Sequence, residues 1–370
     1  MAPRSSAIRL LLVAMALLGL ALSASRWAFA AEPTSETDER LKSILQRFPK
    51  ADLNGDGVLT ESEAREARER LRRQPGDTRP QQARQPRGPE PTLTDVAYGP
   101  HERNVLDLWK AESEKPAPLV VFIHGGGFVG GDKSKVRGSP LVKACLDAGV
   151  SFASLNYRFR KHAPIQDIVR DCARAIQFIR TKAKEWNIDP KRIASYGGSA
   201  GAGTSLWLAF HDDLADPKAS DPVLRQSSRL ACAGSLNGQA SYDLREWETI
   251  LGPPPEGVSR EGEQLGFYHF KTAEESETPE ADRIMKDMSM IGHMSSDDPP
   301  VFLFCAGPNT EPKDRGHYVH HPRHAIAIRD RCRREKVEVE CVLHDDIAAG
   351  AKQDDRLRAF LFKHLGVKTD

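Results

Sequence analysis

The sequence lacks several features that mark specialised classes of protein. Its 53 Lys and Arg side chains are balanced by 52 Asp and Glu, so the net charge of +1 provides no strong positive field to attract nucleic acid. The six cysteines are widely spaced and include no Cys-x-x-Cys pair, which favours buried thiols over a disulfide framework or a zinc site. A mean hydropathy of −0.51 excludes a protein with many membrane spans. The 370 residues, 39% of them hydrophobic, still suffice for more than one compact unit.

The N-terminus has the pattern of an export signal. Arg4 and Arg9 precede an uncharged run at residues 10–22, which is too short to span a bilayer comfortably. The sequence Ala-Phe-Ala at 28–30 then supplies the small-x-small pattern at which signal peptidase cuts. We therefore expect residues 1–30 to be removed and the mature protein to be exported, to the periplasm, the cell envelope or the medium, with no stable membrane span. An uncleaved membrane anchor is the alternative.

Residues 31–73 are predicted to form a small helical unit around a calcium-binding loop. Between two predicted helices, the stretch 52–63 reads Asp-Leu-Asn-Gly-Asp-Gly-Val-Leu-Thr-Glu-Ser-Glu and matches an EF-hand loop at each diagnostic position. Ca²⁺ takes about seven oxygen ligands, and this spacing supplies them around the turn that the glycine at its sixth position permits. The candidate ligands are Asp52, Asn54, Asp56, the Val58 carbonyl, Thr60 and Glu63. A single exported loop of this kind favours weakly bound, structural calcium, and a chance acidic loop is the alternative.

The rest of the chain predicts a linker followed by an α/β domain. Residues 74–91 are rich in Pro, Gln and Arg, which is typical of a semi-extended linker. Over residues 92–370, short apolar runs alternate with helical patterns. This alternation predicts a mostly parallel central sheet with helices on both faces. The predicted strands include residues 119–123, 150–155, 192–196, 230–235, 301–304 and 337–343.

Two glycine-rich motifs in this domain predict a nucleophile and a site for negative charge. Gly-Gly-Ser-Ala-Gly at 197–201 is a G-x-S-x-G sequence between a predicted strand and a predicted helix, where a sharp turn exposes the Ser199 hydroxyl. His-Gly-Gly-Gly at 124–127 follows another predicted strand. Main-chain N–H groups of Gly125 or Gly126, together with that of Ala200, would hold the oxyanion of a tetrahedral intermediate.

With these motifs, residues 92–368 resemble an α/β-hydrolase of the HGGG-type esterase and lipase group, similar to hormone-sensitive-lipase-like enzymes. The EF-hand segment joined to such a domain also resembles exported bacterial hydrolases. The resemblance implies a Ser-His-Asp/Glu triad that acts on carboxylic esters without an organic cofactor. Small esters and esterified polysaccharides or lipids are the substrates it suggests, and nucleic acid is not among the expected partners.

The C-terminal third departs from the pattern of this family. The resemblance implies an acid shortly after the strand at 301–304, but residues 307–310 read Gly-Pro-Asn-Thr. It also implies a histidine a few residues after the last strand, where only His344 stands before the terminal helix. The histidine and the acid of the triad are therefore not fixed by position.

Two arrangements are open. In the first, His344 is the base and Glu311 or Asp314 orients it. In the second, the two loops exchange roles, so that the base is His320 or His321 and the acid is Asp345 or Asp346. We favour the exchange because two carboxylates end the last predicted strand, although His321 precedes a proline and can instead simply cap a helix.

The sequence thus predicts an exported serine hydrolase that cleaves carboxylic esters through Ser199 and a main-chain oxyanion hole. The alternative is a binding protein that keeps the hydrolase fold and the calcium-binding EF-hand but has lost its catalytic base.

Overall fold

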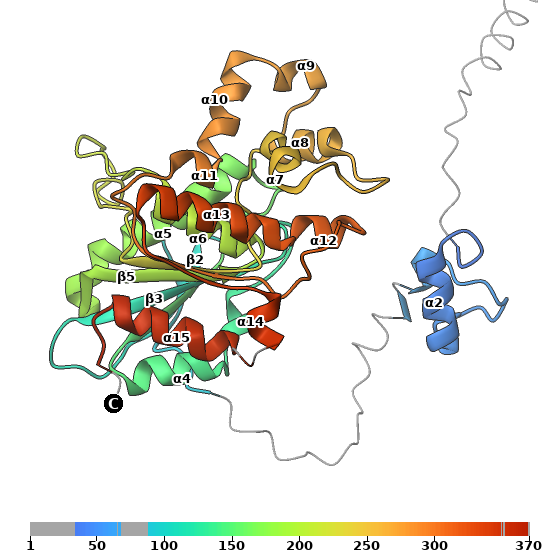
Figure 1. Cartoon of the computed structure of the whole chain (residues 1–370). Helices are drawn as coiled ribbons and strands as arrows, with labels where there is room; N and C mark the ends of the chain where they lie inside the picture. The colour runs from blue at the N-terminus through green and yellow to red at the C-terminus, as the bar shows by residue number, and fades with distance from the viewer. Residues whose placement is uncertain (1–33, 65, 68–87, 349, 351, 369–370) are drawn as a thin grey trace, which may run out of the picture. The chain divides into compact units, whose positions relative to one another are not determined.

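The computed structural model describes residues 34–368 except positions 65, 68–87, 349 and 351. The chain divides into two units, one ending at Arg84 and the other beginning at Gln85, and each contains its own hydrophobic cluster (Figure 1). The predicted signal peptide and residues 74–87 of the predicted linker lie outside the described residues. None of the described helices is both long and apolar enough to cross a membrane.

The small unit is built on an amphipathic helix. Helix α2 (Glu39–Arg47) places Leu41 in a cluster with Leu59, both completely buried, and Ile44 packs against them one turn further on. A short 3-10 helix, η1 (Pro49–Ala51), follows, and residues 61–64 and 66–67 are helical. The predicted helix–loop–helix order is therefore present, and the last three residues of the loop at 52–63 already belong to the second helical segment.

The large unit contains an eight-stranded sheet in the order β1-β2-β4-β3-β5-β6-β7-β8. Strand β2 is antiparallel to both of its neighbours, and strands β3 to β8 are all parallel. This confirms the predicted mostly parallel sheet. The strands are β1 (Leu93–Ala97), β2 (Val105–Trp109), β3 (Ala117–Ile123), β4 (Ser151–Leu155), β5 (Ile188–Gly198), β6 (Cys232–Leu236), β7 (Val301–Phe304) and β8 (Val339–Val342).

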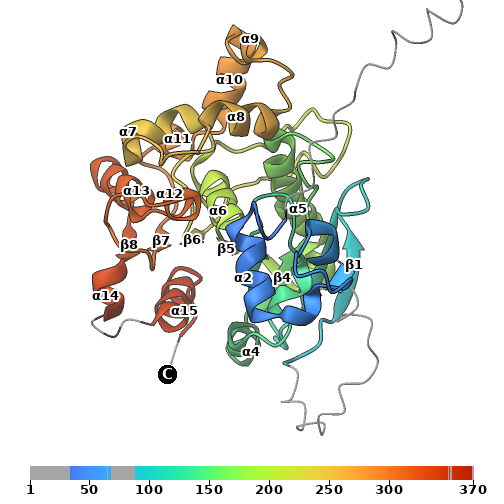
Figure 2. The ribbon, with the colours of Figure 1, turned by 90° about the vertical axis from the view of Figure 1, so that its right-hand side faces the viewer.

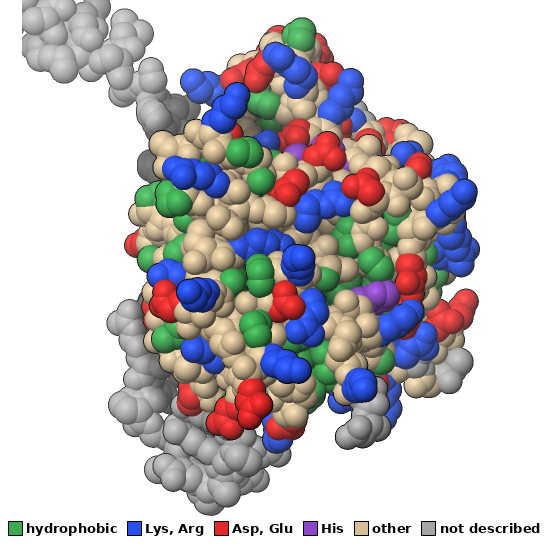
Figure 3. All heavy atoms as spheres, turned by 90° about the vertical axis from the view of Figure 1, so that its left-hand side faces the viewer, with side chains coloured by type: hydrophobic (Ala, Val, Ile, Leu, Met, Phe, Trp, Pro, Cys, Tyr) green, Lys and Arg blue, Asp and Glu red, His purple; other side chains and the backbone are tan. Residues whose placement is uncertain are grey.

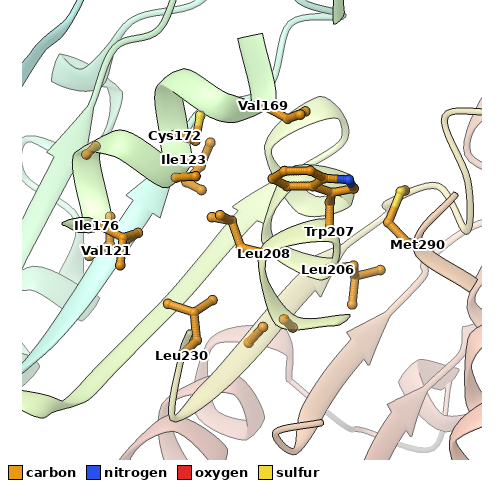
Figure 4. Close-up of a cluster of buried hydrophobic side chains, with 14 of the residues drawn as sticks. Val121, Ile123, Val169, Cys172, Ile176, Leu206, Trp207, Leu208, Leu230 and Met290 are labelled. Carbon is orange, nitrogen blue, oxygen red and sulfur yellow. The ribbon is translucent and has the colours of Figure 1, made fainter. Parts of the chain in front are cut away.

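Helices cover both faces of this sheet because its central strands are apolar on both sides; β3, for example, is buried along its whole length. Helices α5, α6 and α13 lie on one face, and α4 and α15 lie on the other (Figures 1 and 2). Figure 4 shows apolar side chains of α5 and α6 gathered against Val121 and Ile123 of β3. The helices are α4 (Pro140–Asp147), α5 (Ile165–Trp186), α6 (Ala200–Phe210), α13 (Pro322–Glu335) and α15 (Gln353–His364).

Residues 237–300, between β6 and β7, form a segment that we call the cap. It contains a series of short helices above the face that carries α6 and α13 (Figure 1). They are η3 (Leu244–Glu246), α7 (Trp247–Leu251), α8 (Arg260–Tyr268), α9 (Ala273–Ser276), α10 (Pro279–Asp287) and α11 (Met290–His293). Three further short helices are η2 (Lys133–Val136), α12 (Arg315–Val319) and α14 (His344–Ala348).

The distribution of charged side chains and the state of the cysteines are as the composition suggested. Basic and acidic side chains are interspersed over the face of the large unit drawn in Figure 3. All six cysteines are free, and five of them are buried. Burial raises the pKa of the Cys145 thiol to about 12, so this thiol stays protonated at neutral pH.

Candidate active site

Ser199 stands at a sharp turn between β5 and α6. Its backbone has φ +52° and ψ −118°, outside the usual regions for a residue with a side chain, at a cost of about 1–3 kcal/mol. A hydrogen bond from the Ser199 N–H to the Leu236 carbonyl (2.9 Å) holds the turn against β6. The helix can approach β3 so closely only because residue 201 is glycine: a Cβ at Gly201 would overlap the carbonyl of Ile123. The motif therefore forms the predicted strand–turn–helix.

His320 is the imidazole that reaches this serine. Its Nε2 lies 2.8 Å from Ser199 Oγ, and its Nδ1 lies 3.0 Å from the carbonyl oxygen of Gly316. Because a carbonyl only accepts, Nδ1 carries the hydrogen, and the lone pair of Nε2 is left to face the serine hydroxyl. This is the tautomer that a general base requires.

The position of His320 is fixed by the helix that precedes it. Asp314 caps the start of helix α12, its Oδ1 accepting the N–H of His317 (2.8 Å), and His320 caps the end. On the core side, Gln239 Nε2 donates to the carbonyl of Val319 at 3.0 Å, and the Cys305 thiol donates to that of His320 at 3.3 Å. The main chain on both sides of the imidazole is thus anchored.

The predicted oxyanion hole lies beside the same serine. The loop after β3 approaches the turn so closely that a Cβ at Gly125 would overlap the Gly198 carbonyl, and Gly126 adopts φ +116°, a conformation that favours glycine. In the described part of the chain, the N–H groups of Gly125, Gly126 and Ala200 donate to no protein acceptor. All three are available to a bound ligand.

His124 maintains the shape of this loop. The ring is fully buried, stacks on Tyr157 with centroids 4.3 Å apart, and places Nδ1 2.8 Å from the Gly125 carbonyl. Burial lowers its pKa to about 4, so the ring is neutral at physiological pH. Tyr157 also donates its hydroxyl to the His124 carbonyl, at 2.5 Å.

The other residues proposed for the triad lie elsewhere. His321 is almost fully buried and points away from Ser199: its Nε2 contacts the Thr310 carbonyl at 2.6 Å and its Nδ1 accepts the N–H of Arg323, so it caps α13. His344 is exposed at the start of α14, where Nδ1 lies 3.1 Å from the Ala306 carbonyl. Of the histidines that the sequence left open as the base, His320 is therefore the one that reaches Ser199, and His321 and His344 do not.

The predicted acid is also not beside the base. Asp345 is exposed in the first turn of α14 and makes no hydrogen bond or ion pair with His320. Among the described residues, no carboxylate contacts the His320 ring, and the acceptor at Nδ1 is the main-chain carbonyl of Gly316. Sequence reasoning could not have found this acceptor, because every residue type carries a carbonyl.

A cavity of about 300 Å³ opens between the cap and helix α12, and neither Ser199 nor His320 is among the residues that line it. Its walls come from the cap and from the two residues that precede His320. The apolar part consists of Leu244, Trp247, Pro254, Val258, Tyr318 and Val319, and the carboxylates of Glu248, Glu261 and Glu263 also line it.

The predicted calcium loop of the small unit folds around its own polar side chains. Asp52 accepts the N–H groups of Gly55 (2.7 Å) and Gly57 (2.9 Å), so its carboxylate lies inside the turn. Glu63 Oε2 accepts from the N–H of Thr60 at 3.0 Å and from its hydroxyl at 2.9 Å, which brings positions 9 and 12 of the loop together. This oxygen-only donor set suits a hard cation such as Ca²⁺.

The sheet order, the strained serine between β5 and α6, and the free amides beside it define the large unit as an α/β-hydrolase. A family model described as BD-FAE matches residues 106–308. The chain belongs to this family of α/β-hydrolase esterases.

Curated relatives are esterases that match over part of their length. A probable isoprenylcysteine alpha-carbonyl methylesterase of Arabidopsis thaliana, ICMEL2, is 32% identical over 152 residues, which cover 41% of this chain and 36% of the relative. The probable carboxylic ester hydrolase LipM of Mycobacterium tuberculosis is 26% identical over 213 residues, 56% of this chain and 46% of that protein. The matches thus span less than half the length of either relative.

Solved structures share the fold. A truncated carbohydrate esterase from gut microbiota has a TM-score of 0.57 and 16% identity, covering 74% of this chain and 96% of that one. An acetyl ester-xyloside bifunctional hydrolase from Caldicellulosiruptor lactoaceticus has a TM-score of 0.54 and 20% identity, covering 75% and 98%. At these identities the likeness concerns the fold alone.

Proposed function

We propose that this chain is an exported serine hydrolase that cleaves carboxylic esters, with Ser199 as the nucleophile and His320 as the base. The observation that carries the proposal is the 2.8 Å contact between Ser199 Oγ and His320 Nε2, beside three N–H groups that donate to no acceptor among the described residues. The esterase family of the chain supports the same reaction.

In the first half of the reaction, Ser199 Oγ bonds to the ester carbonyl carbon while its proton moves to His320 Nε2. The electron pair of the carbonyl passes to oxygen, and the amides of Gly125, Gly126 and Ala200 stabilise the resulting oxyanion. The bond to the alcohol oxygen then breaks, and His320 returns the proton to that oxygen. In the second half, water attacks the acyl carbon while its proton passes to His320, the bond from that carbon to Ser199 Oγ breaks, and His320 returns the proton to Oγ as the acid leaves.

The Gly316 carbonyl holds the imidazole in the productive tautomer but carries no net charge. The imidazolium that forms during the reaction is therefore stabilised less than it would be by a carboxylate. We expect slower turnover than in an enzyme with a complete triad, and we expect Ser199 to retain its reactivity.

The cavity between the cap and α12, close to His320 along the chain, supports an ester with a modest apolar group. Trp247, Tyr318 and Val319 offer apolar walls to an acyl or alcohol moiety, and the neighbouring carboxylates disfavour an anionic substrate. Small esters and esterified polysaccharides or lipids all fit this description. The carbohydrate esterases among the structural neighbours add weight to polysaccharide esters.

A binding protein with a decayed site is the second candidate, favoured by the lack of a carboxylate at His320 among the described residues. Labelling of the folded full chain with a fluorophosphonate separates the two, with Ser199→Ala as the control. Ester hydrolysis requires labelling of the parent chain and none of the variant. A folded parent chain that stays unlabelled would establish the binding protein instead.

We further propose that the loop at 52–63 binds calcium as a structural ion and that the protein is exported. The inward carboxylate of Asp52 and the pairing of Thr60 with Glu63 support the first point. The signal-like sequence at 1–30 supports the second.

A further inference from the structure

A cluster of metal-ligating side chains lies at the far end of the nucleophile helix. His211 terminates α6, whose first residue follows Ser199, while Asp287 and His293 end α10 and α11 of the cap. All three side chains are partly buried, with exposed fractions of 12%, 28% and 23% in that order. Three separate elements thus converge on one point.

The spacing of their donor atoms is close to that of a metal site. Asp287 Oδ1 lies 3.0 Å from His211 Nε2 and 3.9 Å from His293 Nε2, and one donor atom from each of the three side chains lies within 4.8 Å of the others. Donors around tetrahedral Zn²⁺ stand about 3.3 Å apart, given bonds of about 2.0–2.1 Å. His293 Nε2 also lies 2.9 Å from the main-chain carbonyl oxygen of Asp287, so His293 must release this contact and turn its ring for the three donors to meet on one ion.

The hydrogen-bond pattern of His211 requires a positive centre in this cluster. Its Nδ1 lies 2.8 Å from the carbonyl oxygen of Asp212, which only accepts, so Nδ1 carries a hydrogen. In the neutral ring, Nε2 would then present its lone pair to the Asp287 carboxylate, another acceptor, at 3.0 Å. Either a second proton or a metal ion must separate these two atoms.

Residues around the three candidate ligands fix their orientation through hydrogen bonds and ring packing. Metal ligands in proteins are oriented by contacts of the same kind. Arg170 binds the other carboxylate oxygen of Asp287 (2.7 Å), which leaves Oδ1 facing the histidines. The Trp207 ring packs against that of His211, with centroids 4.4 Å apart, and its Nε1 donates to the Asp287 carbonyl at 2.8 Å. Such contacts orient ligands and raise metal affinity.

We propose that His211, Asp287 and His293 bind a transition-metal ion of the zinc type, with water in the fourth position. Two imidazoles and one carboxylate suit Zn²⁺ better than Ca²⁺, which prefers oxygen ligands. The 11 residues of α6 separate the site from Ser199 by about 16 Å, so the ion has a structural role. It joins α10 and α11 of the cap to the helix that begins at the nucleophile.

The test is Zn²⁺ titration of the folded full chain, followed by calorimetry, with millimolar Ca²⁺ present to occupy the loop at 52–63. We expect one Zn²⁺ per chain, a rise in the melting temperature, and affinity at least tenfold weaker in both His211→Gln and His293→Gln. His364→Gln, on α15, is the matched control and should bind like the parent. Co²⁺ in place of Zn²⁺ should give the visible absorption of a four-coordinate ion.

Two outcomes would overturn the proposal. If the folded parent chain binds no Zn²⁺ or Co²⁺, a proton separates His211 from Asp287 and the cluster is an ion pair. If binding survives both substitutions but is lost in His162→Gln, the ion occupies the exposed cluster of His101, Glu102 and His162 instead. Circular dichroism of each variant distinguishes loss of ligands from loss of fold.

Discussion

At Ser199 the chain accepts a strained backbone, and its neighbours compensate for the strain. The N–H of Ser199 bonds to β6, and its carbonyl accepts the N–H groups of Ala202 (2.9 Å) and Gly203 (3.0 Å) in the first turn of α6. Both of its polar main-chain groups are therefore satisfied inside the turn. The side-chain hydroxyl is left for the imidazole of His320.

Replacement of His320 should remove activity without removing the fold. We expect His320→Gln to lower kcat for a short-chain aryl ester by about 10³-fold or more, because the proton of Ser199 then has no acceptor. Steady-state hydrolysis measures this, and circular dichroism verifies the fold.

The matched control is the neighbouring histidine. His321→Ala should leave kcat within a few-fold of the parent and lower the free energy of unfolding by about 1 kcal/mol, since it removes a helix cap. Loss of hydrolysis in His344→Gln together with normal hydrolysis in His320→Gln would assign the base to the loop after β8.

Buried histidines make stability sensitive to acid. Burial lowers the pKa of His324 to about 3, whereas an imidazole in the unfolded chain titrates near its usual value of 6.5. Between these values the unfolded chain binds a proton that the folded chain does not, so the free energy of unfolding falls as the pH drops from about 6.5 toward 3. Urea unfolding from pH 7 to 4 should show this loss.

His324→Asn isolates this contribution. Asn can still accept the N–H of Ala240, as His324 Nδ1 does at 3.3 Å, but it does not titrate. The variant should lose less stability between pH 7 and 4 than the parent chain, although His124 still titrates in both. An equal pH dependence in the two proteins would show that His324 does not contribute.

At the same scale, the sequence predicted Ser199 and the glycine amides by position, but it left the choice among His320, His321 and His344 open. The glycines around Ser199 and after His124 leave a recognisable pattern because only glycine permits those close approaches. His320 and His321 are adjacent and chemically identical, and the end of α12 determines which one faces the serine. That geometry depends on contacts with Gln239 and Cys305, which are distant in sequence.

Among the elements, the buried parallel strands were the most predictable. Strands such as β3 and β7 are continuous apolar runs because helices cover both of their faces. The edge strand β1 is partly exposed and was not anticipated, and the cap helices are too short to show a clear periodicity. Tertiary packing stabilises such short helices more than their own sequence does.

The cap elements should determine which acyl groups are accepted. Val258 lines the cavity between the cap and α12 and is only partly buried, so Val258→Phe should fill the space without disturbing the core. We expect kcat/KM for a butyrate ester to fall about tenfold or more, while that for the acetate changes little. An assay in which the butyrate and the acetate ester compete for the enzyme measures the ratio of their kcat/KM values.

Leu224→Phe provides the control, because Leu224 is exposed and does not line this cavity. An unchanged butyrate-to-acetate ratio in Val258→Phe would mean that the acyl group binds elsewhere.

For the whole molecule, the two units have separate cores and are expected to bind different ligands. Leu41 and Leu59 anchor the small unit, whereas the large unit packs two clusters on the two faces of its sheet. Ion binding at the loop at 52–63 should therefore stabilise the small unit first.

Calcium binding can be tested at one side chain. Glu63→Gln should abolish binding in calorimetry, because it removes the carboxylate at the twelfth position of the loop, and the parent Kd should be about 10⁻⁴–10⁻³ M. Glu61→Gln changes the same residue type at a position that is not a ligand, and it should retain binding within a few-fold. Equal isotherms for the parent and Glu63→Gln would refute the site.

The match to the family model ends at residue 308, before the loop that carries His320. Because β7 and β8 are parallel neighbours, the loops that follow them leave the sheet at the same edge. A side chain from either loop can therefore stand at the same rim of the sheet while the strands and the serine turn stay as they are. In relatives whose triad looks incomplete in the sequence, the missing histidine should be sought in every loop at this edge of the sheet. The order of residues along the chain alone does not locate it.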